Sequence, residues 1–195
     1  MREVGAKPWH EVAHEHLSGE EDAPIGVDPS LLPLGSMKAK TKFWTEKGSP
    51  CHWKEIEENL IDELWPDQPE WATEHVQVHS VTYTGRSVAQ NTAEVMEKVE
   101  EAKGDSILIT ALDEIAWITN LRGKDIDYNP LFFSYAVVHK VDGLNRIQLY
   151  SNPVKFEEVQ DYLEEQRIDV APYDQVFTDL STGKFKDHKI VIDEN

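Results

Sequence analysis

The stretch from Leu112 to Tyr135, LDEIAWITNLRGKDIDYNPLFFSY, constrains the fold of this chain more than any other part of the sequence. The apolar residues just before it, ending at Thr110, are typical of a buried strand. Asp113 can then cap a short helical turn by accepting hydrogen bonds from backbone N–H groups that have no partner inside the helix. The stretch is therefore expected to begin with a strand that leads into a capped helical turn over residues 114–117.

The second half of this stretch predicts a tight connection followed by a strand. Gly123 permits a positive φ that other residues avoid, which would leave the guanidinium of Arg122 free to point outward. Pro130 excludes a helix because it has no N–H to donate. Residues 131–138 are rich in aromatic and β-branched side chains, the composition of a buried strand. The pattern favours a strand, loop, strand element of an α/β core.

The region from residue 76 onward alternates between strand and helix patterns. Asp142-Gly143 is typical of a two-residue hairpin turn, and Asn152-Pro153 is typical of a helix start. Strands that alternate with helices predict an α/β fold, here a mixed β-sheet covered by helices. The expected strands are 76–81, 106–110, 131–138, 146–150, 168–171 and 189–192, and the expected helices are 91–103, 154–166 and 173–180.

The region before residue 66 predicts a smaller set of α/β elements. The expected helices are 9–17, 30–44 and 59–64, and the expected strands are 24–27 and 51–56. Residues 66–75 carry two prolines and several acids without a regular apolar period, as expected of a linker. We therefore expect one domain within 1–65, a linker at 66–75 and a second domain at 76–195.

Composition narrows the classes of partner and compartment. The sequence has 37 Asp and Glu against 19 Lys and Arg, so its formal net charge of −18 repels nucleic acid phosphates and anionic membranes. No window approaches the roughly 20 apolar residues of a membrane span, and the N-terminus has no apolar signal core. The single Cys51 cannot form an internal disulfide. We expect a cytoplasmic protein with no nucleic-acid and no membrane partner.

The segment His10-Glu11-Val12-Ala13-His14 matches the H-E-x-x-H pattern of zinc metalloproteases. In that pattern two imidazoles one helical turn apart bind the metal, and the glutamate activates the bound water. His16 lies about 200° round an α-helix from His14, so it cannot join the same face. The expected helix is also short and has no preceding core. We expect a solvated helix with incidental histidines, with a zinc metalloprotease as the alternative.

Four short segments, in order along the chain, match one known pattern. They are Gly26-Val27-Asp28-Pro29, NLIDELW at 59–65, Tyr83-Thr84-Gly85 and the central stretch from Leu112 to Tyr135. Together they resemble the first and middle domains of the three-domain aminopeptidase P (Xaa-Pro aminopeptidase) family. In that family a Leu-Asp-Glu-Ile-Ala-Trp segment leads into Asn-Leu-Arg-Gly, then Asn-Pro and an aromatic strand.

The resemblance implies the C-terminal part of a first creatinase-N-like domain followed by a complete second copy. Such enzymes remove the N-terminal residue that precedes proline, using two divalent metal ions, usually manganese, held by two Asp, one His and two Glu in a C-terminal pita-bread domain. None of those five ligands maps onto this chain. We therefore expect no catalytic residue, no bound cofactor and no activity of the chain alone. The implied partners are the catalytic domain, proline-containing peptides and a second copy in a homodimer.

In such an enzyme the N-terminal domains shape access to the catalytic cleft. Arg122, with Asn120 and Tyr128 near it, is expected to reach toward that cleft or an interface as a fixed cation or hydrogen-bond donor. The alternative for Arg122 is an ion pair with Asp125 or Asp127 inside its own loop. The alternative for the whole chain is a free-standing pseudoenzyme or interaction module that keeps the scaffold without catalysis.

Overall fold

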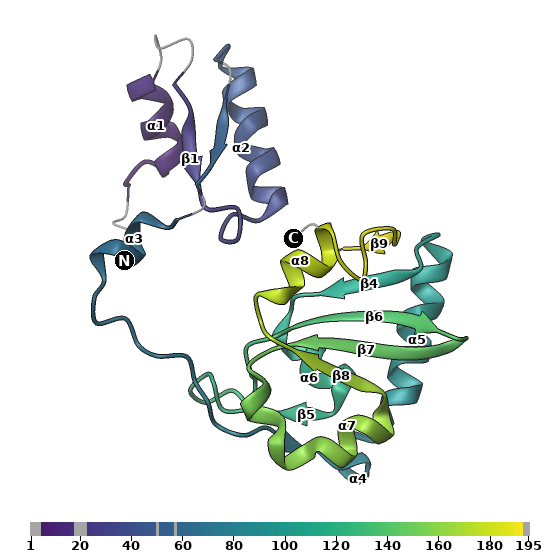
Figure 1. Cartoon of the computed structure of the whole chain (residues 1–195). Helices are drawn as coiled ribbons and strands as arrows, with labels where there is room; N and C mark the ends of the chain where they lie inside the picture. Colours follow the sequence, from purple (N-terminus) through teal and green to yellow (C-terminus); the bar gives the residue numbers. More distant parts are fainter. Residues whose placement is uncertain (1–4, 18–22, 50, 57, 193–195) are drawn as a thin grey trace. The chain divides into compact units, whose positions relative to one another are not determined.

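Two units of unequal size are formed by the residues that the computed structural model describes, namely 5–17, 23–49, 51–56 and 58–192 (Figure 1). The first unit ends at Pro69 and the second begins at Glu70. Within the described ranges, each helix is too short or too polar to span a bilayer. The domain boundaries expected from the sequence stay a prediction, because compactness alone does not establish independent folding.

The first unit packs helices against a two-stranded parallel sheet, in which Ile25 pairs with Trp53. Pro33 occupies the N-cap of the second helix, which therefore begins four residues later than the pattern suggested. Trp44 is the one fully buried hydrophobic residue of the described part of this unit, and its Nε1 donates to the backbone oxygen of His10 at 3.1 Å. The elements are α1 (Trp9–Leu17), β1 (Ile25–Val27), α2 (Leu34–Glu46), β2 (Trp53–Glu55) and α3 (Leu60–Leu64).

The second unit is built on a five-stranded sheet with the order β8-β7-β6-β4-β9 (Figure 1). Its centre is the β6–β7 hairpin, whose turn residues Asp142 and Gly143 have φ of 51° and 78°, as two-residue hairpin turns require. β4 is antiparallel to β6, whereas β8 and β9 run parallel to β7 and β4, which confirms the expected mixed sheet. The strands are β4 (Ser106–Ile109), β6 (Tyr135–Val141), β7 (Leu144–Tyr150), β8 (Ile168–Ala171) and β9 (Ile190–Val191).

Both faces of this sheet are covered. Ala136 and Val138 of β6 face the larger core, with side chains from the helices that pack on that side. Val137 faces the opposite side and packs with Val176 and Phe185. Because successive strand residues point to opposite faces, a run that is buried throughout indicates cover on both sides. The helical elements are α4 (Val81–Thr84), α5 (Val88–Glu101), α6 (Leu112–Thr119), η1 (Pro153–Val159), α7 (Gln160–Gln166) and α8 (Gln175–Ser181).

Local capping explains where the observed elements depart from the expected ranges. The expected strand 76–81 is confined to β3 (Gln77–Val78), because the Ser80 side chain accepts from the backbone N–H of Thr82 and starts α4. The expected helix 91–103 begins earlier, because Ser87 and Gln90 form a reciprocal capping box. The expected single helix at 154–166 is a 3-10 helix followed by an α-helix.

Candidate functional site

The site is built from the end of α6 and the loop that follows it. The N-cap residue of α6 is Ala111, so the predicted cap by Asp113 is wrong. Asn120 ends the helix in the left-handed conformation, with φ of 51°, and is 1% exposed. Its Nδ2 donates to the backbone oxygen of Arg86 at 2.8 Å, and its own backbone oxygen accepts from the N–H of His79 at 2.8 Å. Asn120 therefore holds the local backbone and is not presented to a ligand.

Arg122 follows in β5 (Leu121–Arg122), which pairs with β3. Its guanidinium is not free to point outward as predicted, because Nη1 donates to the backbone oxygens of Ala116 at 2.5 Å and Leu121 at 2.8 Å. Burial lowers the pKa of this guanidinium. The alternative ion pair with an acidic residue of its own loop is also wrong, since no carboxylate of the described chain lies within 4.0 Å of it.

Gly123 is needed for a close approach rather than for a positive φ. A Cβ at this position would lie 2.5 Å from the Cβ of Phe132 and 2.9 Å from the backbone oxygen of Leu131. The Gly123 N–H donates to the backbone oxygen of Pro130 at 3.2 Å and closes the loop of residues 123–130. The loop is therefore packed directly against the chain that leads into β6.

A buried ion pair fixes this loop from inside. Asp125 and Lys155 have side-chain exposures of 0% and 2% and contact each other through Oδ2 and Nζ. The same Oδ2 accepts from the backbone N–H of Phe133 at 2.7 Å. Lys155 was not predicted from the sequence, although it lies four residues before Val159 on the apolar side of the expected helix. A lysine on the apolar side of a helix indicates a buried charge, and a buried charge requires a partner of opposite charge or a hydrogen bond.

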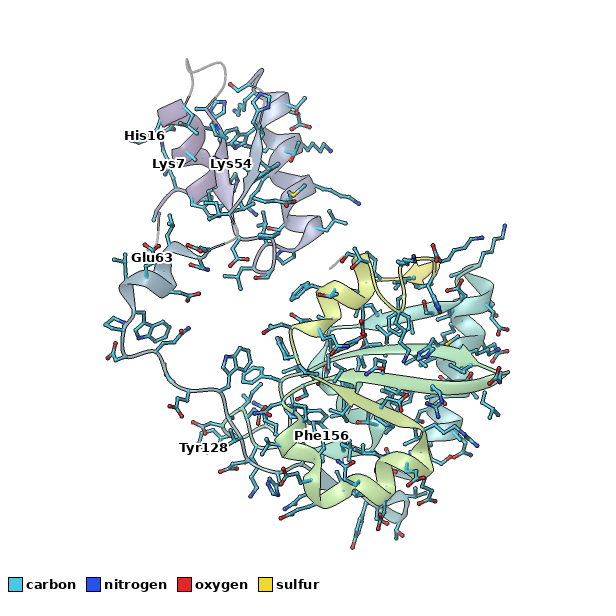
Figure 2. All side chains as sticks on the ribbon, in the orientation of Figure 1. Lys7, His16, Lys54, Glu63, Tyr128 and Phe156 are labelled. Atoms are coloured by element: carbon cyan, nitrogen blue, oxygen red, sulfur yellow. The ribbon has the colours of Figure 1, made fainter. Side chains whose placement is uncertain are left out.

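Tyr128 lies at the tip of the loop and is fully exposed, at 104%. Its φ of 64° is rare for a bulky residue, and the bridge between Ile126 and Asn129 holds the backbone on either side. Figure 2 shows Tyr128 at the periphery of the second unit, in contrast to the interior position of Phe156. Residues with unusual backbone conformations cluster at binding sites and switch regions, which makes Tyr128 a candidate for a functional contact.

Arg122 and Tyr128 line the same open cavity of about 560 Å³, together with Lys124, Glu74 and His75. The structure therefore brings together two of the three residues expected at the site and leaves out Asn120. His75 is held by Glu158, with 2.9 Å between Nδ1 and Oε1. Arginine and tyrosine are residue types that bind carbonyl or carboxylate oxygens.

No described residue of α1 is buried, and two of its three histidines, His10 and His14, are half-buried against aromatic rings, whereas His16 is exposed. The rings of His10 and His14 lie edge-on to Phe43, with centroid distances of 5.1 and 6.0 Å. Nδ1 of His16 lies 2.9 Å from the backbone oxygen of Val12 in its own helix. Across the described ranges, no three His, Cys, Asp or Glu residues are grouped so that they could hold a metal ion.

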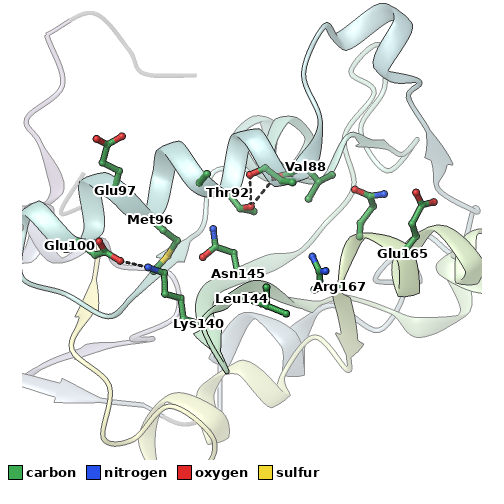
Figure 3. Close-up of a pocket in the computed structure, with 14 residues that line it drawn as sticks. Val88, Thr92, Met96, Glu97, Glu100, Lys140, Leu144, Asn145, Glu165 and Arg167 are labelled. Atoms are coloured by element: carbon green, nitrogen blue, oxygen red, sulfur yellow. Dashed lines mark hydrogen bonds and ion pairs between the residues drawn. The ribbon is translucent and has the colours of Figure 1, made fainter.

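A second cavity of about 440 Å³ lies between α5, the tip of the β6–β7 hairpin and the end of α7 (Figure 3). Lys140 and Glu100 form an ion pair at one end of it, and the hydroxyl of Thr92 donates to the backbone oxygen of Val88 at 2.9 Å. Glu165 and Arg167 lie at the other end. This cavity contains none of the residues expected at the site.

Comparisons with known proteins agree on one family. The model of the Creatinase/Prolidase N-terminal domain matches residues 67–195. Probable Xaa-Pro aminopeptidase P of Talaromyces marneffei is 34% identical over 177 residues, which are 90% of this chain and 26% of that protein. The Aspergillus niger counterpart is 35% identical over 177 residues, which are 90% of this chain and 27% of that protein.

A solved structure extends the likeness to the fold. The X-prolyl aminopeptidase from Caenorhabditis elegans, described as a cytosolic enzyme with a di-nuclear active site, matches with a TM-score of 0.80 at 28% identity. The match covers 95% of this chain and 29% of that one. The chain therefore spans about a quarter of the length of these relatives.

Proposed function

Because the chain belongs to the Creatinase/Prolidase N-terminal domain family, we propose that it is the non-catalytic N-terminal and middle region of a metal-dependent Xaa-Pro aminopeptidase. Such an enzyme removes the residue that precedes proline from the N-terminus of a peptide. The proposal is supported by the names of the full-length relatives. The cytosolic description of the Caenorhabditis elegans enzyme supports a cytoplasmic location.

The two divalent metal ions of the proposed enzyme, manganese by resemblance, have no fitting ligand set in the described residues of this chain. Two ions require several carboxylates and an imidazole around one point, and no three such side chains gather here. The chain's own contribution therefore concerns how a peptide reaches and lies in the cleft rather than how its bond is cleaved.

The loop of residues 123–130 is the part of the chain that we assign to this role. Arg122 supplies a cation whose position is fixed by two backbone carbonyls, and Tyr128 supplies an exposed ring on a constrained backbone. The buried pair of Asp125 and Lys155 keeps the loop in one shape. A preorganised wall of this kind restricts which peptides enter and lowers the entropic cost of binding those that do. The same exposed ring can also meet the catalytic domain or a second copy in a homodimer.

The assignment to a metallopeptidase is tested by the gene downstream of Asn195. An open reading frame that encodes two Asp, one His and two Glu in a further domain is the expected result. A stop codon directly after Asn195 would favour a free-standing interaction module instead. The purified chain alone is expected to leave Xaa-Pro peptides intact with or without added manganese, and hydrolysis that depends on a residue of this chain would contradict the proposal.

A further inference from the structure

The imidazole of His139 in β6 is buried beneath a segment that we call the cover, which comprises residues 182–191. His139 is 2% exposed. Among the described residues, the rings that contact it are Phe185, with ring centroids 4.9 Å apart, and His188, with centroids 6.3 Å apart. Both rings belong to the cover. Displacement of the cover would therefore bring this imidazole into contact with solvent.

The surroundings of His139 oppose its protonated form. Burial, followed by the charge of Lys184 in the cover, lowers the pKa of this imidazole from 6.5 to about 4. The charge of His188 adds to the shift, whereas the backbone of Val137 and the charge of Asp169 oppose it only in part. The closed structure therefore excludes a proton that a solvated imidazole would bind between these two pKa values.

The carboxylates on this side of the sheet already face other cations. Oδ2 of Asp169 lies 2.8 Å from Nη1 of Arg146, the residue opposite His139 in the register of β6 and β7. Oδ1 of Asp105, directly before β4, lies 3.2 Å from Nδ1 of His188. A proton on His139 would add a further positive charge to this buried group, and a buried charge without a partner is costly.

The cover is held more weakly than the strands beneath it. Phe185 is the one buried residue among residues 182–191, all of which the structure describes. β9 contributes two residues to the sheet, whereas β6 and β7 pair over seven residues each. Segments with few buried apolar side chains open at a lower free energy than the centre of a domain. We therefore expect the cover to open while β6 and β7 stay paired.

We propose that the cover is a pH-sensitive switch, which opens when His139 takes up a proton. The imidazole is solvated in the open state, so the open state binds the proton more tightly than the closed state does. The opening equilibrium constant therefore increases as the pH falls below about 6.5 and levels off below about 4. Opening frees the edge of β4 that pairs with β9 and uncovers Val137. The inference is independent of the proposed function.

Hydrogen exchange of this chain tests the switch, with each rate corrected for the intrinsic effect of pH on exchange. The two pKa values predict that the opening constant of the cover rises about thirtyfold between about pH 7.5 and about pH 5. The amides of Asp105 and Phe185 report it, because they donate to the backbone oxygens of Lys189 and Asp179. Their opening constants are expected to exceed those of the β6–β7 amides. Equal constants at every pH would show that only the whole unit unfolds, which would overturn the proposal.

A substitution at the imidazole tests whether His139 causes the change. His139→Phe keeps a ring beneath Phe185 but cannot take up a proton, so the thirtyfold change is expected to disappear. His79→Phe is the matched control, because His79 is a half-buried histidine of the second unit that stacks on Tyr83 outside the cover. It is expected to retain the full change. A change of the same size in His139→Phe would overturn the proposal.

A second variant tests whether the cover is what buries the imidazole. Phe185→Ala removes the buried ring of the cover, so the pKa of His139, followed by NMR, is expected to rise from about 4 toward 6.5. The β6–β7 amides are expected to stay protected in this variant, which shows that the sheet remains folded. A pKa that stays near 4 in Phe185→Ala would contradict the proposed role of the cover.

Discussion

The two units use the same kinds of elements but bury them very differently. In the first, two three-residue strands pair with each other alone, and Trp44 is the one hydrophobic residue of its described part that is fully buried. In the second, the seven-residue strands β6 and β7 lie at the centre of a sheet covered on both faces. An isolated pair of strands is marginally stable in water, whereas a covered sheet of several strands is stable by itself. The second unit also carries the cavity lined by Arg122 and Tyr128.

The substitution expected to show the largest difference in stability between the two units is Trp44→Ala. Removal of a buried tryptophan lowers the free energy of unfolding by about 3–5 kcal/mol. We expect this loss to exceed the stability that so small a core provides. We expect hydrogen exchange to show loss of protection in the described residues up to 69, with the strands of the second unit unchanged. Trp65→Ala, which removes a half-exposed indole, is expected to alter neither. Equal loss of protection in both units would contradict the claim that only the first unit depends on Trp44.

A large effect confined to the second unit is expected for Lys155→Met. The substitution leaves Asp125 as a buried, unpaired carboxylate, and breaking such a pair costs about 3–5 kcal/mol. Urea denaturation followed by a probe in the β6–β7 hairpin measures this loss. Lys140→Met is the control, because its pair with Glu100 is solvent-exposed and is worth less than about 1 kcal/mol.

Adding Asp125→Leu to Lys155→Met is expected to recover part of the stability. No recovery would show that the charge pair is not the cause.

A smaller, pH-dependent effect is expected from His139 in β6. Burial, followed by the charge of Lys184, lowers the pKa of this imidazole from 6.5 to about 4, and the backbone of Val137 opposes the shift only in part. The charge of His188 lowers the pKa further, whereas that of Asp169 opposes the shift. The unfolded chain therefore binds a proton that the native state excludes between these two values. The contribution of His139 is complete above about pH 6.5 and is lost as the pH falls toward 4, by about 2–3 kcal/mol.

This pH dependence is measured as the free energy of unfolding of the second unit across that window. His139→Leu is expected to flatten the curve, whereas His52→Leu, at an exposed position of the first unit, is expected to leave it unchanged. An equally steep curve in His139→Leu would assign the effect to other groups.

Short-range patterns were sufficient to predict most elements of both units. The helix at 9–17, the strand at 168–171 and the Asp142-Gly143 turn were predicted correctly, because periodicity and turn chemistry act over a few residues. The first strand of the second unit was overestimated, because the cap at Ser80 competes with strand propensity.

The site was predicted less well, because its geometry depends on contacts between distant segments. Arg122 turns back to the backbone oxygen of Ala116 in α6, and Asp125 pairs with a lysine thirty residues away. Asn120 was grouped with Arg122 by sequence proximity, but the helix end directs it into the structure. Tyr128 is exposed at the tip of the loop, and its positive φ could not be read from an Asp-Tyr-Asn sequence.

The central claim, that the loop of residues 123–130 forms a wall of the substrate cleft, is tested most directly by the KM of the full-length protein for an Xaa-Pro peptide. Tyr128→Ala is expected to raise KM about tenfold with little change in kcat, because contacts made equally with substrate and transition state affect binding alone. Tyr83→Ala, which removes another exposed tyrosine at 79%, is expected to leave both constants unchanged. An unchanged KM in a folded, active Tyr128→Ala enzyme would contradict the account.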